Sequence, residues 1–327
     1  MAAESNTLID DIRAKRSRPR SKMGKVSLTI DKDQRVKVVG AVYGIYYSIE
    51  EEDFCADLYL DHYNQRLKLS NISGRNYKKL FKRILLIAHE NNFDKILAVE
   101  KEENLKLFLQ HNFIIEAKID NFYNPNVSAY FLALFLSDDR KKSQLEEVEE
   151  NLLLKVKKHA PLKINPKTHS LYTFRQARRE DIPKLLSLYR KVFESYPSPL
   201  IHNDYLEFIF AKESIFYVAV ENNSLENNIV AAASAELVKG TKAAEMTDCA
   251  TLKNHRGNGL MINILWQLEK VLKDMNYSCA YTSARARSYG MNFVFHRLGY
   301  QYLGRSKNQC DIQGAFEDMN IWSKTLC

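Results

Sequence analysis

A strand, a tight glycine turn and an amphipathic helix follow one another in the last third of the chain, and this succession limits the fold more than any other feature. Residues 245–252 have the pattern of a strand, and residues 256–259 (Arg-Gly-Asn-Gly) make the turn. Apolar residues then recur at helical spacing as far as Met275. The first amides of such a helix have no partner within it and carry the positive end of its dipole. The succession predicts an α/β fold with an anion site, suited to a pyrophosphate, at the helix start.

The turn does not fit two well-known phosphate motifs. The Walker loop ends in Gly-Lys-Ser/Thr, which is absent here, and the dinucleotide fingerprint needs a third glycine where Ile262 stands. The shorter turn used for coenzyme A remains. An irregular strand-to-helix turn without a ligand is the alternative interpretation.

The composition is that of a globular protein of two domains, with 327 residues, 45% of them hydrophobic and 27% charged. No apolar run approaches the roughly 18 residues of a membrane span, and the N-terminus lacks the apolar core of a secretory signal. The five cysteines are odd in number and form no CxxC pair. We therefore expect a cytoplasmic protein with no membrane partner, no disulfide framework and no metal.

Part of the formal charge of +8 lies in a basic segment near the N-terminus, residues 13–25. We interpret residues 1–25 as a disordered, solvated tail, and an arm for nucleic acid or an anionic surface is the alternative. No aromatic residues are interleaved there for base stacking, so we expect no nucleic-acid partner.

Three segments follow the tail: an N-terminal α/β domain over 26–136, a helical and loop connector over 137–170, and a second α/β domain over 171–327. A weak repeat links the two domains, because Phe108–Phe113 resembles Phe295–Tyr300 and each ends a helix before a strand. We interpret the first domain as a decayed copy of the second that serves a scaffold or homodimer role. Chance similarity of common α/β units is the alternative. The patterns also predict elements over 54–69 (strand), 77–90 (helix), 301–307 (strand) and 316–322 (strand).

The glycine turn resembles that of the GNAT acetyltransferase superfamily, which reads Arg/Gln-x-x-Gly-x-Gly/Ala. Arg256, Gly259 and Met261 take its three fixed places, with Met261 departing from Gly/Ala. The order of elements over 171–327 agrees, and Gly299-Tyr300 looks like the Gly-Phe ending of the family's final helix. The resemblance implies a C-terminal GNAT fold with a mixed sheet, acetyl-CoA as cosubstrate and transfer of an acetyl group to a small-molecule amine.

Several stretches are similar to the β-lysine N-acetyltransferases, namely residues 116–123, 129–131, 244–252, 290–292 and 314–320. The similarity extends over nearly all of 26–327. It implies acetylation of the side-chain amine of β-lysine to N-ε-acetyl-β-lysine, a compatible solute. Another acceptor amine (a polyamine, an aminoglycoside or a protein lysine) and a non-catalytic acyl-CoA-binding scaffold are the alternatives.

An acceptor amine has an ordinary pKa near 10.4, so a carboxylate must bind its ammonium form and take a proton. Glu245 and Asp248, on the strand before the turn, are the candidates, with Glu245 slightly ahead as the base. Being three apart, they point to opposite faces of a regular strand, and a bulge is needed to bring them to one side. Many relatives have a tyrosine as general acid where Phe295 stands. Tyr289 is the candidate substitute, with a core or surface position as the alternative.

The resemblance implies that coenzyme A is held by the end of the strand, the turn and the last helix. Backbone amides near residues 249–251 would donate to the oxyanion. Cys249 has no evident histidine partner, so we expect direct transfer and not an acyl-cysteine route. The predicted cofactor-binding residues are Cys249, Ala250, Thr251, Leu252, Arg256, Gly257, Asn258, Gly259, Leu260, Met261 and Asn292.

β-Lysine carries two ammonium groups and one carboxylate, so its site needs carboxylates and a cation. The superfamily builds its acceptor pocket in the last strands, which carry several acidic residues here, and two arginines follow the strand over 279–284. The predicted substrate-binding residues are Tyr196, Arg285, Arg287, Asn308, Asp311, Glu317 and Asp318. A surface polar position is the alternative for each.

Overall fold

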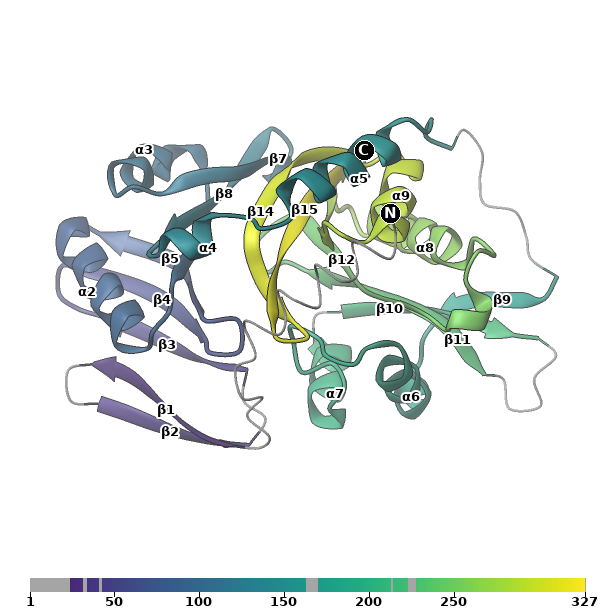
Figure 1. The fold of residues 1–327 in the computed structure, drawn as a ribbon, viewed down its shortest axis with the longest axis horizontal. Helices are drawn as coiled ribbons and strands as arrows, with labels where there is room; N and C mark the ends of the chain where they lie inside the picture. Colours follow the sequence, from purple (N-terminus) through teal and green to yellow (C-terminus); the bar gives the residue numbers. More distant parts are fainter. Residues whose placement is uncertain are drawn as a thin grey trace. The chain divides into compact units, whose positions relative to one another are not determined.

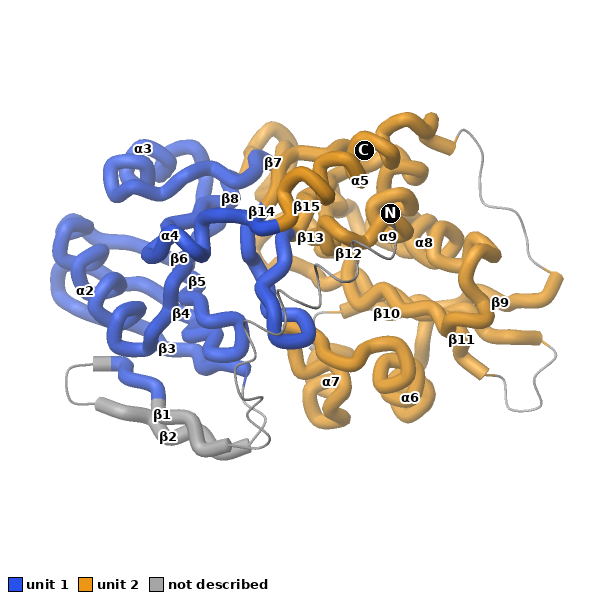
Figure 2. The backbone as a smooth tube through the Cα atoms, in the orientation of Figure 1, with its two compact units in different colours: residues 1–118, 130–144, 306–318 blue, residues 119–129, 145–305, 319–327 orange. Residues whose placement is uncertain are grey.

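The computed structural model describes residues 24–31, 34–40, 43–162, 170–212, 214–222 and 228–326. The chain divides into two compact units, coloured blue and orange in Figure 2. Unit 1 comprises residues 1–118, 130–144 and 306–318, and unit 2 comprises 119–129, 145–305 and 319–327. Most of the predicted basic tail and residues 163–169 of the predicted connector lie outside the described residues.

Unit 1 is built on a six-stranded mixed sheet with the strand order β3-β4-β5-β6-β8-β7 (Figure 1). A separate antiparallel hairpin, β1 (Gly24–Asp31) and β2 (Gln34–Gly40), precedes it. The strands of the sheet are β3 (Gly44–Glu50), β4 (Phe54–Asp61), β5 (Arg66–Gly74), β6 (Lys95–Glu100), β7 (Ile114–Asn124) and β8 (Val127–Phe135). The helices are α2 (Tyr77–Glu90), α3 (Glu102–Gln110) and α4 (Asp138–Lys141).

Unit 2 contains a seven-stranded mixed sheet with the order β14-β15-β13-β12-β11-β10-β9. Its strands are β9 (Tyr172–Gln176), β10 (Ser214–Glu221), β11 (Ile229–Leu237), β12 (Ala243–Thr251), β13 (Cys279–Arg285), β14 (Gln301–Ile312) and β15 (Ala315–Thr325). The helices are α5 (Glu146–Lys157), α6 (Ile182–Val192), α7 (Asn203–Lys212), α8 (Leu260–Asp274) and α9 (Tyr289–Arg297), with short 3-10 turns η1 (Arg179–Asp181) and η2 (Lys253–His255).

The two sheets share one topology. In each, three antiparallel strands lead through a helix to a parallel neighbour, and then through a second helix to a final hairpin whose last strand lies inside. The series β3 to β8 with α2 and α3 therefore corresponds, element by element, to the series β10 to β15 with α8 and α9. The fold is the predicted mixed α/β class, and this correspondence supports the interpretation of the first half as a copy of the second.

Apolar periodicity explains why these segments form these elements. Helix α8 buries Ile264, Leu268 and Leu272 at a spacing of four residues, which places them on one face. Strand β11 is buried on both faces: its alternate alanines 231, 233 and 235 pack with α8, whereas Ala232 packs in the core that contains α6. A strand covered on both sides carries an almost continuous apolar run.

The tips of two hairpins belong to a different unit from the rest of their strands. Residues 119–129, the tip of β7 and β8, are counted with unit 2, and residues 306–318, the tip of β14 and β15, with unit 1. Within unit 2, the tip 119–129 accepts backbone and side-chain hydrogen bonds: Lys242 N–H donates to Phe122 O (3.1 Å) and Ser278 Oγ to Asn121 O (2.8 Å). The Phe122 ring also lies 5.3 Å from that of Tyr281.

The helix predicted over 77–90 is confirmed. The single strand predicted over 54–69 is wrong: it is two strands, because Asp61 accepts from the Asn64 backbone (3.1 Å) and Gln65 has a left-handed φ of 49°, which together reverse the chain. The strands predicted at the C-terminus are longer than expected. They meet in a two-residue turn at Gln313 and Gly314, both with positive φ, as tight hairpins require.

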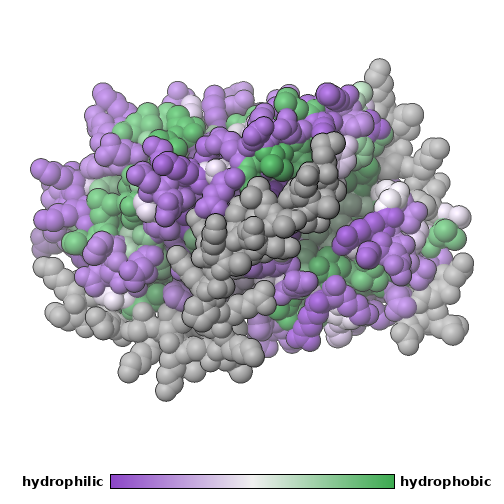
Figure 3. Space-filling view, in the orientation of Figure 1, coloured by the Kyte–Doolittle hydropathy of each residue, from purple (hydrophilic) through white to green (hydrophobic). Residues whose placement is uncertain are grey.

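Hydrophilic side chains cover much of the face drawn in Figure 3, with hydrophobic ones in separate patches. Within the described ranges, none of the helices combines the length and the apolar character needed to cross a membrane.

Candidate active site

Strand β12 carries a bulge at Asp248. Thr247 lies opposite Ser234 and Ala250 lies opposite Ala232, so three residue steps on β12 face two on β11. Asp248 takes up the extra residue with a left-handed φ of 53°, which a non-glycine residue seldom adopts. Its Oδ2 accepts from Ser234 Oγ at 2.7 Å.

The bulge brings both candidate carboxylates to one face of the sheet. Glu245 lies opposite Glu236, and Thr247 lies opposite Ser234. Residues two apart on a strand share a face, so the Ser234 side chain, and Asp248 bound to it, lie on the side of Glu236 and Glu245. This is the arrangement that the sequence allowed only with a bulge. The face is the one on which α6 packs, because Ala232 belongs to that core.

Asp248 is a buried carboxyl, 6% exposed. Burial raises its pKa to about 6 and the charge of Glu236 acts in the same direction, while hydrogen bonds from Ser234 and Tyr196 oppose them. Tyr189, on α6, is wholly buried, and its hydroxyl has no hydrogen-bond partner in the described part of the chain. Burial and then the charge of Asp248 raise the pKa of Tyr189.

Glu245 accepts a hydrogen bond from the Tyr281 hydroxyl on β13 at 3.3 Å. Glu236, directly opposite on β11, was missed by the reading of the sequence. One signal could have found it: Ser234 and Glu236 are polar residues two apart in an otherwise apolar strand, the pattern of a single polar face.

Strands β12 and β13 diverge just past Glu245. Their parallel pairing covers only Ala243–Glu245 on β12, although β12 continues to pair with β11 as far as Thr251. The stretch predicted to supply oxyanion donors, residues 249–251, lies beyond this divergence. Cys249 is near it, with Sγ donating to Thr247 O at 3.5 Å, and burial raises the pKa of this thiol far above its usual range.

The glycine turn has the backbone that the sequence predicted. Gly257 and Gly259 have φ of 84° and 72°, and an added Cβ at either would meet no atom of the described residues within 4 Å. Gly259 is the N-cap of α8, and among the described residues no side chain caps this helix start. Met261 points into the core and is 8% exposed. The first amides of α8 are therefore available to an anion.

Other predicted site residues of unit 2 have defined partners. The Asn292 amide donates to Arg285 O (2.9 Å) and Ser288 O (2.7 Å), and its Oδ1 accepts from Asn320 and Trp322. It thus fixes the start of α9 to β13 and β15. Tyr289 is 40% exposed, and its hydroxyl bonds to His159 at 3.1 Å. The roles predicted for these two residues stay predictions.

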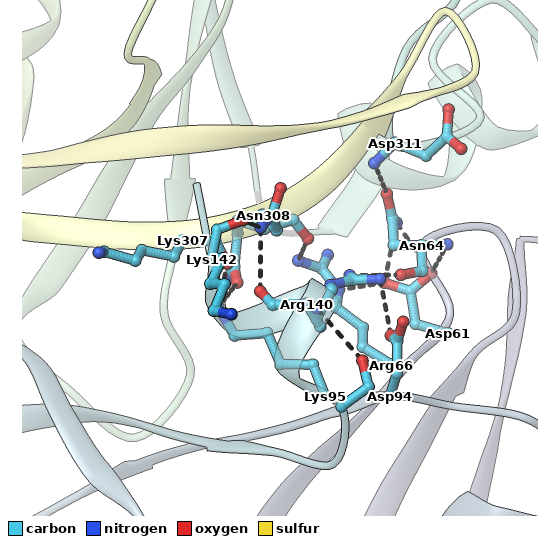
Figure 4. A network of polar contacts seen from close by, with 12 residues as sticks. Asp61, Asn64, Arg66, Asp94, Lys95, Arg140, Lys142, Lys307, Asn308 and Asp311 are labelled. Atoms are coloured by element: carbon cyan, nitrogen blue, oxygen red, sulfur yellow. Dashed lines mark hydrogen bonds and ion pairs between the residues drawn. The ribbon is translucent and has the colours of Figure 1, made fainter. Parts of the chain in front are cut away.

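The four acidic and amide residues predicted in the last strands belong to the hairpin tip of unit 1. Figure 4 shows Asn308 and Asp311 within a network of polar contacts. Asn308 Nδ2 donates to Arg140 O (3.0 Å) and Lys142 O (2.9 Å), and its backbone amide to Asp318 Oδ1 (2.7 Å). The Asp311 amide donates to Asn64 Oδ1 (3.0 Å), and Glu317 is buried. Their predicted substrate roles stay predictions.

Three buried cations organise this network of unit 1 (Figure 4). Lys95 is fully buried and donates to Glu116 Oε1 (2.9 Å), Lys307 O (2.8 Å) and Gln309 Oε1 (2.8 Å). Burial lowers the pKa of Lys95 to about 8. Arg66 pairs with Asp61 at 2.7 Å, and Arg140 pairs with Asp94 at 2.8 Å. Each cation has a carboxylate partner, so the network holds the hairpin tip 306–318 in place.

Comparison with known proteins places these features in a family. The profile of the acetyltransferase (GNAT) family matches residues 182–300. The chain is 34% identical over 263 residues to a β-lysine N(6)-acetyltransferase of Methanococcus maripaludis, a match that covers 80% of this chain and 93% of the relative. This chain belongs to the GNAT acetyltransferase family, as its glycine turn predicted, and it is an enzyme that transfers an acetyl group to an amine.

Two further proteins are similar to this chain. N-acetyltransferase YodP of Bacillus subtilis is 32% identical over 279 residues, which cover 85% of this chain and 99% of the relative. A β-lysine N(6)-acetyltransferase of Methanosarcina mazei is 40% identical over 156 residues, which cover 47% of this chain and 56% of the relative.

Proposed function

We propose that this enzyme acetylates the side-chain amine of β-lysine to N-ε-acetyl-β-lysine, with acetyl-CoA as the donor and by direct transfer. The observation that carries the proposal is the bulge at Asp248, which gathers anionic groups on one face of β12 at the point where β12 leaves β13. Two relatives named as β-lysine N(6)-acetyltransferases support the acceptor. The product would serve as a compatible solute made in the cytoplasm.

The residues present fit coenzyme A. The uncapped start of α8 and the positive φ of Gly257 and Gly259 suit a diphosphate, which the amides of residues 257–261 would bind. The donor supplies its acetyl group as a thioester. Amides of residues 249–251 would donate to the carbonyl oxygen as charge develops, and each such donor is worth roughly 3–4 kcal/mol.

Asp248 is the proposed proton acceptor. An ordinary amine is an ammonium ion at neutral pH and must lose a proton before it can attack. A base works best when its pKa lies near the working pH, and the pKa of Asp248, about 6, meets this condition. Glu245, which the sequence ranked first, would hold the cation beside it. The Cys249 thiol remains protonated because of its raised pKa, which favours direct transfer.

Mass spectrometry of the product formed from β-lysine and acetyl-CoA tests the proposal. We expect one acetyl group on the side-chain nitrogen, and a kcat/KM for β-lysine well above those for α-lysine and spermidine. Equal activity on the three amines would contradict the acceptor and leave the family assignment standing.

A further inference from the structure

Ser234 is a polar residue in a stretch of β11 that is otherwise apolar. Residues 229–235 are all buried, and the others among them are alanine, isoleucine or valine. Alanine would fill this place in the core as well as serine does, and a buried hydroxyl is costly unless it is hydrogen-bonded. The serine therefore has a use other than packing, and its hydrogen bond shows what that use is.

The Ser234 hydroxyl ties Asp248 to the neighbouring strand. Ser234 Oγ donates to Asp248 Oδ2 at 2.7 Å, and both residues are buried. Asp248 is the bulged residue of β12, with a left-handed φ of 53°, and a bulge interrupts the regular alternation of side chains along a strand. A hydrogen bond that crosses from β11 to β12 therefore fixes where this carboxylate lies, which the strand alone would not do.

The groups that face the bulged carboxyl change its pKa in two directions. Burial raises this pKa most, and the charge of Glu236 raises it further. Hydrogen bonds from Ser234 and Tyr196 lower it, and the bond from Ser234 has the larger effect. Tyr189 and Cys249 also interact electrostatically with the carboxylate, and both keep their protons because the pKa of each is raised. Ser234 is therefore the group that chiefly offsets burial.

We infer that Ser234 is a positioning residue for the acetyl transfer: its hydroxyl holds the Asp248 carboxylate in place and in the form that can accept the proton of the acceptor amine. This inference rests on the proposed function, in which Asp248 takes that proton. The hydroxyl keeps its own proton throughout, so it acts on the carboxylate and takes no part in the transfer itself. Without it, burial leaves the carboxyl largely protonated at neutral pH and unable to act as a base.

The test is the pH profile of Ser234→Ala. Losing a buried hydrogen bond to a charged group should move the acidic limb of kcat/KM for β-lysine upward from about 6 by about one to two pH units. The variant should therefore lose about two- to tenfold in kcat/KM at pH 7 and stay within about threefold of the parent above about pH 9. Recovery at high pH distinguishes a shifted carboxyl from a damaged site.

Ser278→Ala is the matched control. Ser278 is a buried serine of the same unit, and its Oγ donates to Asn121 O at 2.8 Å. The control removes a hydrogen bond that does not involve Asp248, so it should leave the acidic limb where the parent has it.

Carbon NMR of protein labelled at the aspartate carboxyl carbons follows Asp248 without any turnover. The resonance that is missing from Asp248→Asn should titrate near 6 in the parent. In Ser234→Ala it should titrate higher, by the same amount as the acidic limb moves.

The outcomes separate the two proposals. If Ser234→Ala shifts neither the limb nor the resonance, or if Ser278→Ala shifts both equally, the inference about Ser234 is overturned, while loss of the limb in Asp248→Asn still upholds Asp248 as the base. If the resonance moves and the limb stays, another group sets the limb, and the role of Asp248 falls together with the inference.

Discussion

The two copies of the fold share a topology and a bulge but differ in what surrounds the bulge. In unit 1, strand β5 bulges at Asn71 (φ 50°), which donates to Asp57 on β4 at 2.8 Å, just as β12 bulges at Asp248 beside Ser234 on β11. Hydrogen bonds, first from Ser48 and then from Asn71, lower the pKa of Asp57, whereas burial raises that of Asp248.

The start of the helix that follows the bulge also differs between the two units, because it is capped in only one of them. In unit 1 the Asn76 side chain caps α2 by accepting from the Lys79 amide at 3.2 Å, whereas no side chain caps α8 in unit 2. The buried cations of unit 1 are likewise paired with carboxylates of that unit. The features proposed to serve catalysis, namely the uncapped start of α8 and the buried carboxyl of Asp248, both lie in unit 2. The comparison therefore favours unit 2 as the catalytic unit.

The strongest test of this comparison is Asp248→Asn. Because an amide cannot accept the proton, we expect kcat to fall by about 10²–10⁴-fold. In the parent, kcat/KM should rise with pH through about 6, as Asp248 ionises in the free enzyme, and this acidic limb should vanish in the variant. Asp57→Asn, at the equivalent bulge in unit 1, is the control and should keep the parent's activity. Comparable losses in the two variants would refute the assignment to unit 2.

Asp248→Asn should also change stability in a characteristic direction. The folded-state pKa of about 6 lies above the ordinary 3.8, so the folded state binds the extra proton and stability falls as pH rises from about 4 to 6. The loss, up to about 3 kcal/mol, persists at neutral pH, and the amide removes it. If the variant is inactive but unfolds at a higher urea concentration than the parent at pH 7, the Asp248 carboxylate serves function at the expense of stability. A less stable variant would mark Asp248 as structural.

Substitutions in the buried ion-pair network of unit 1 should lower stability and leave activity nearly unchanged, which is the opposite of the result expected for Asp248→Asn. Lys95→Met leaves Glu116 buried without its cation, so we expect a loss of about 3–5 kcal/mol in the free energy of unfolding by urea. Under conditions where the variant is folded, kcat should stay within about threefold of the parent. The double variant Lys95→Met, Glu116→Gln should recover part of the stability. A large fall in kcat with unchanged stability would show that the network serves the chemistry.

A smaller effect is expected at the helix start. Gly259→Val places a β-branched residue at a φ of 72°, beside the amides proposed for the diphosphate, and should raise the KM for acetyl-CoA about tenfold. Gly240→Val is a close control, since Gly240 also has a φ of 72° and open space around its Cβ. Isothermal titration with coenzyme A would detect the difference. Equal affinities in the two variants would argue against the diphosphate site.

The smallest effect is predicted for Tyr189→Phe. Removing a buried hydroxyl without a partner should leave the ligand-free protein as stable as the parent or slightly more stable, by about 1 kcal/mol. Unfolding by urea checks the direction, and a clear loss of stability would show that the hydroxyl has a partner.

Local features of the fold could be predicted from the sequence, and features that depend on register could not. The turn at Gly257 and Gly259 and the helix after it follow from neighbouring residues. The bulge at Asp248 and the pairing of Glu236 with Glu245 depend on how β11 and β12 align, which alternation alone does not fix.

The buried ion-pair network of unit 1 could not be predicted from the sequence for a related reason. It joins residues from 61 to 311, and Lys95, Arg66 and Arg140 look in the sequence like ordinary surface cations. Only the structure shows that they are buried and paired.

Neither unit is one continuous piece of chain, and this limits how the protein can be taken apart. A fragment that begins at residue 171 loses the segment 119–129, whose Phe122 lies against Tyr281, the residue that donates to Glu245. It also keeps the tip 306–318 without Lys95 and Arg66. A gene encoding the C-terminal half alone should therefore yield a poorly folded product, and a mutation that unfolds either half should abolish activity.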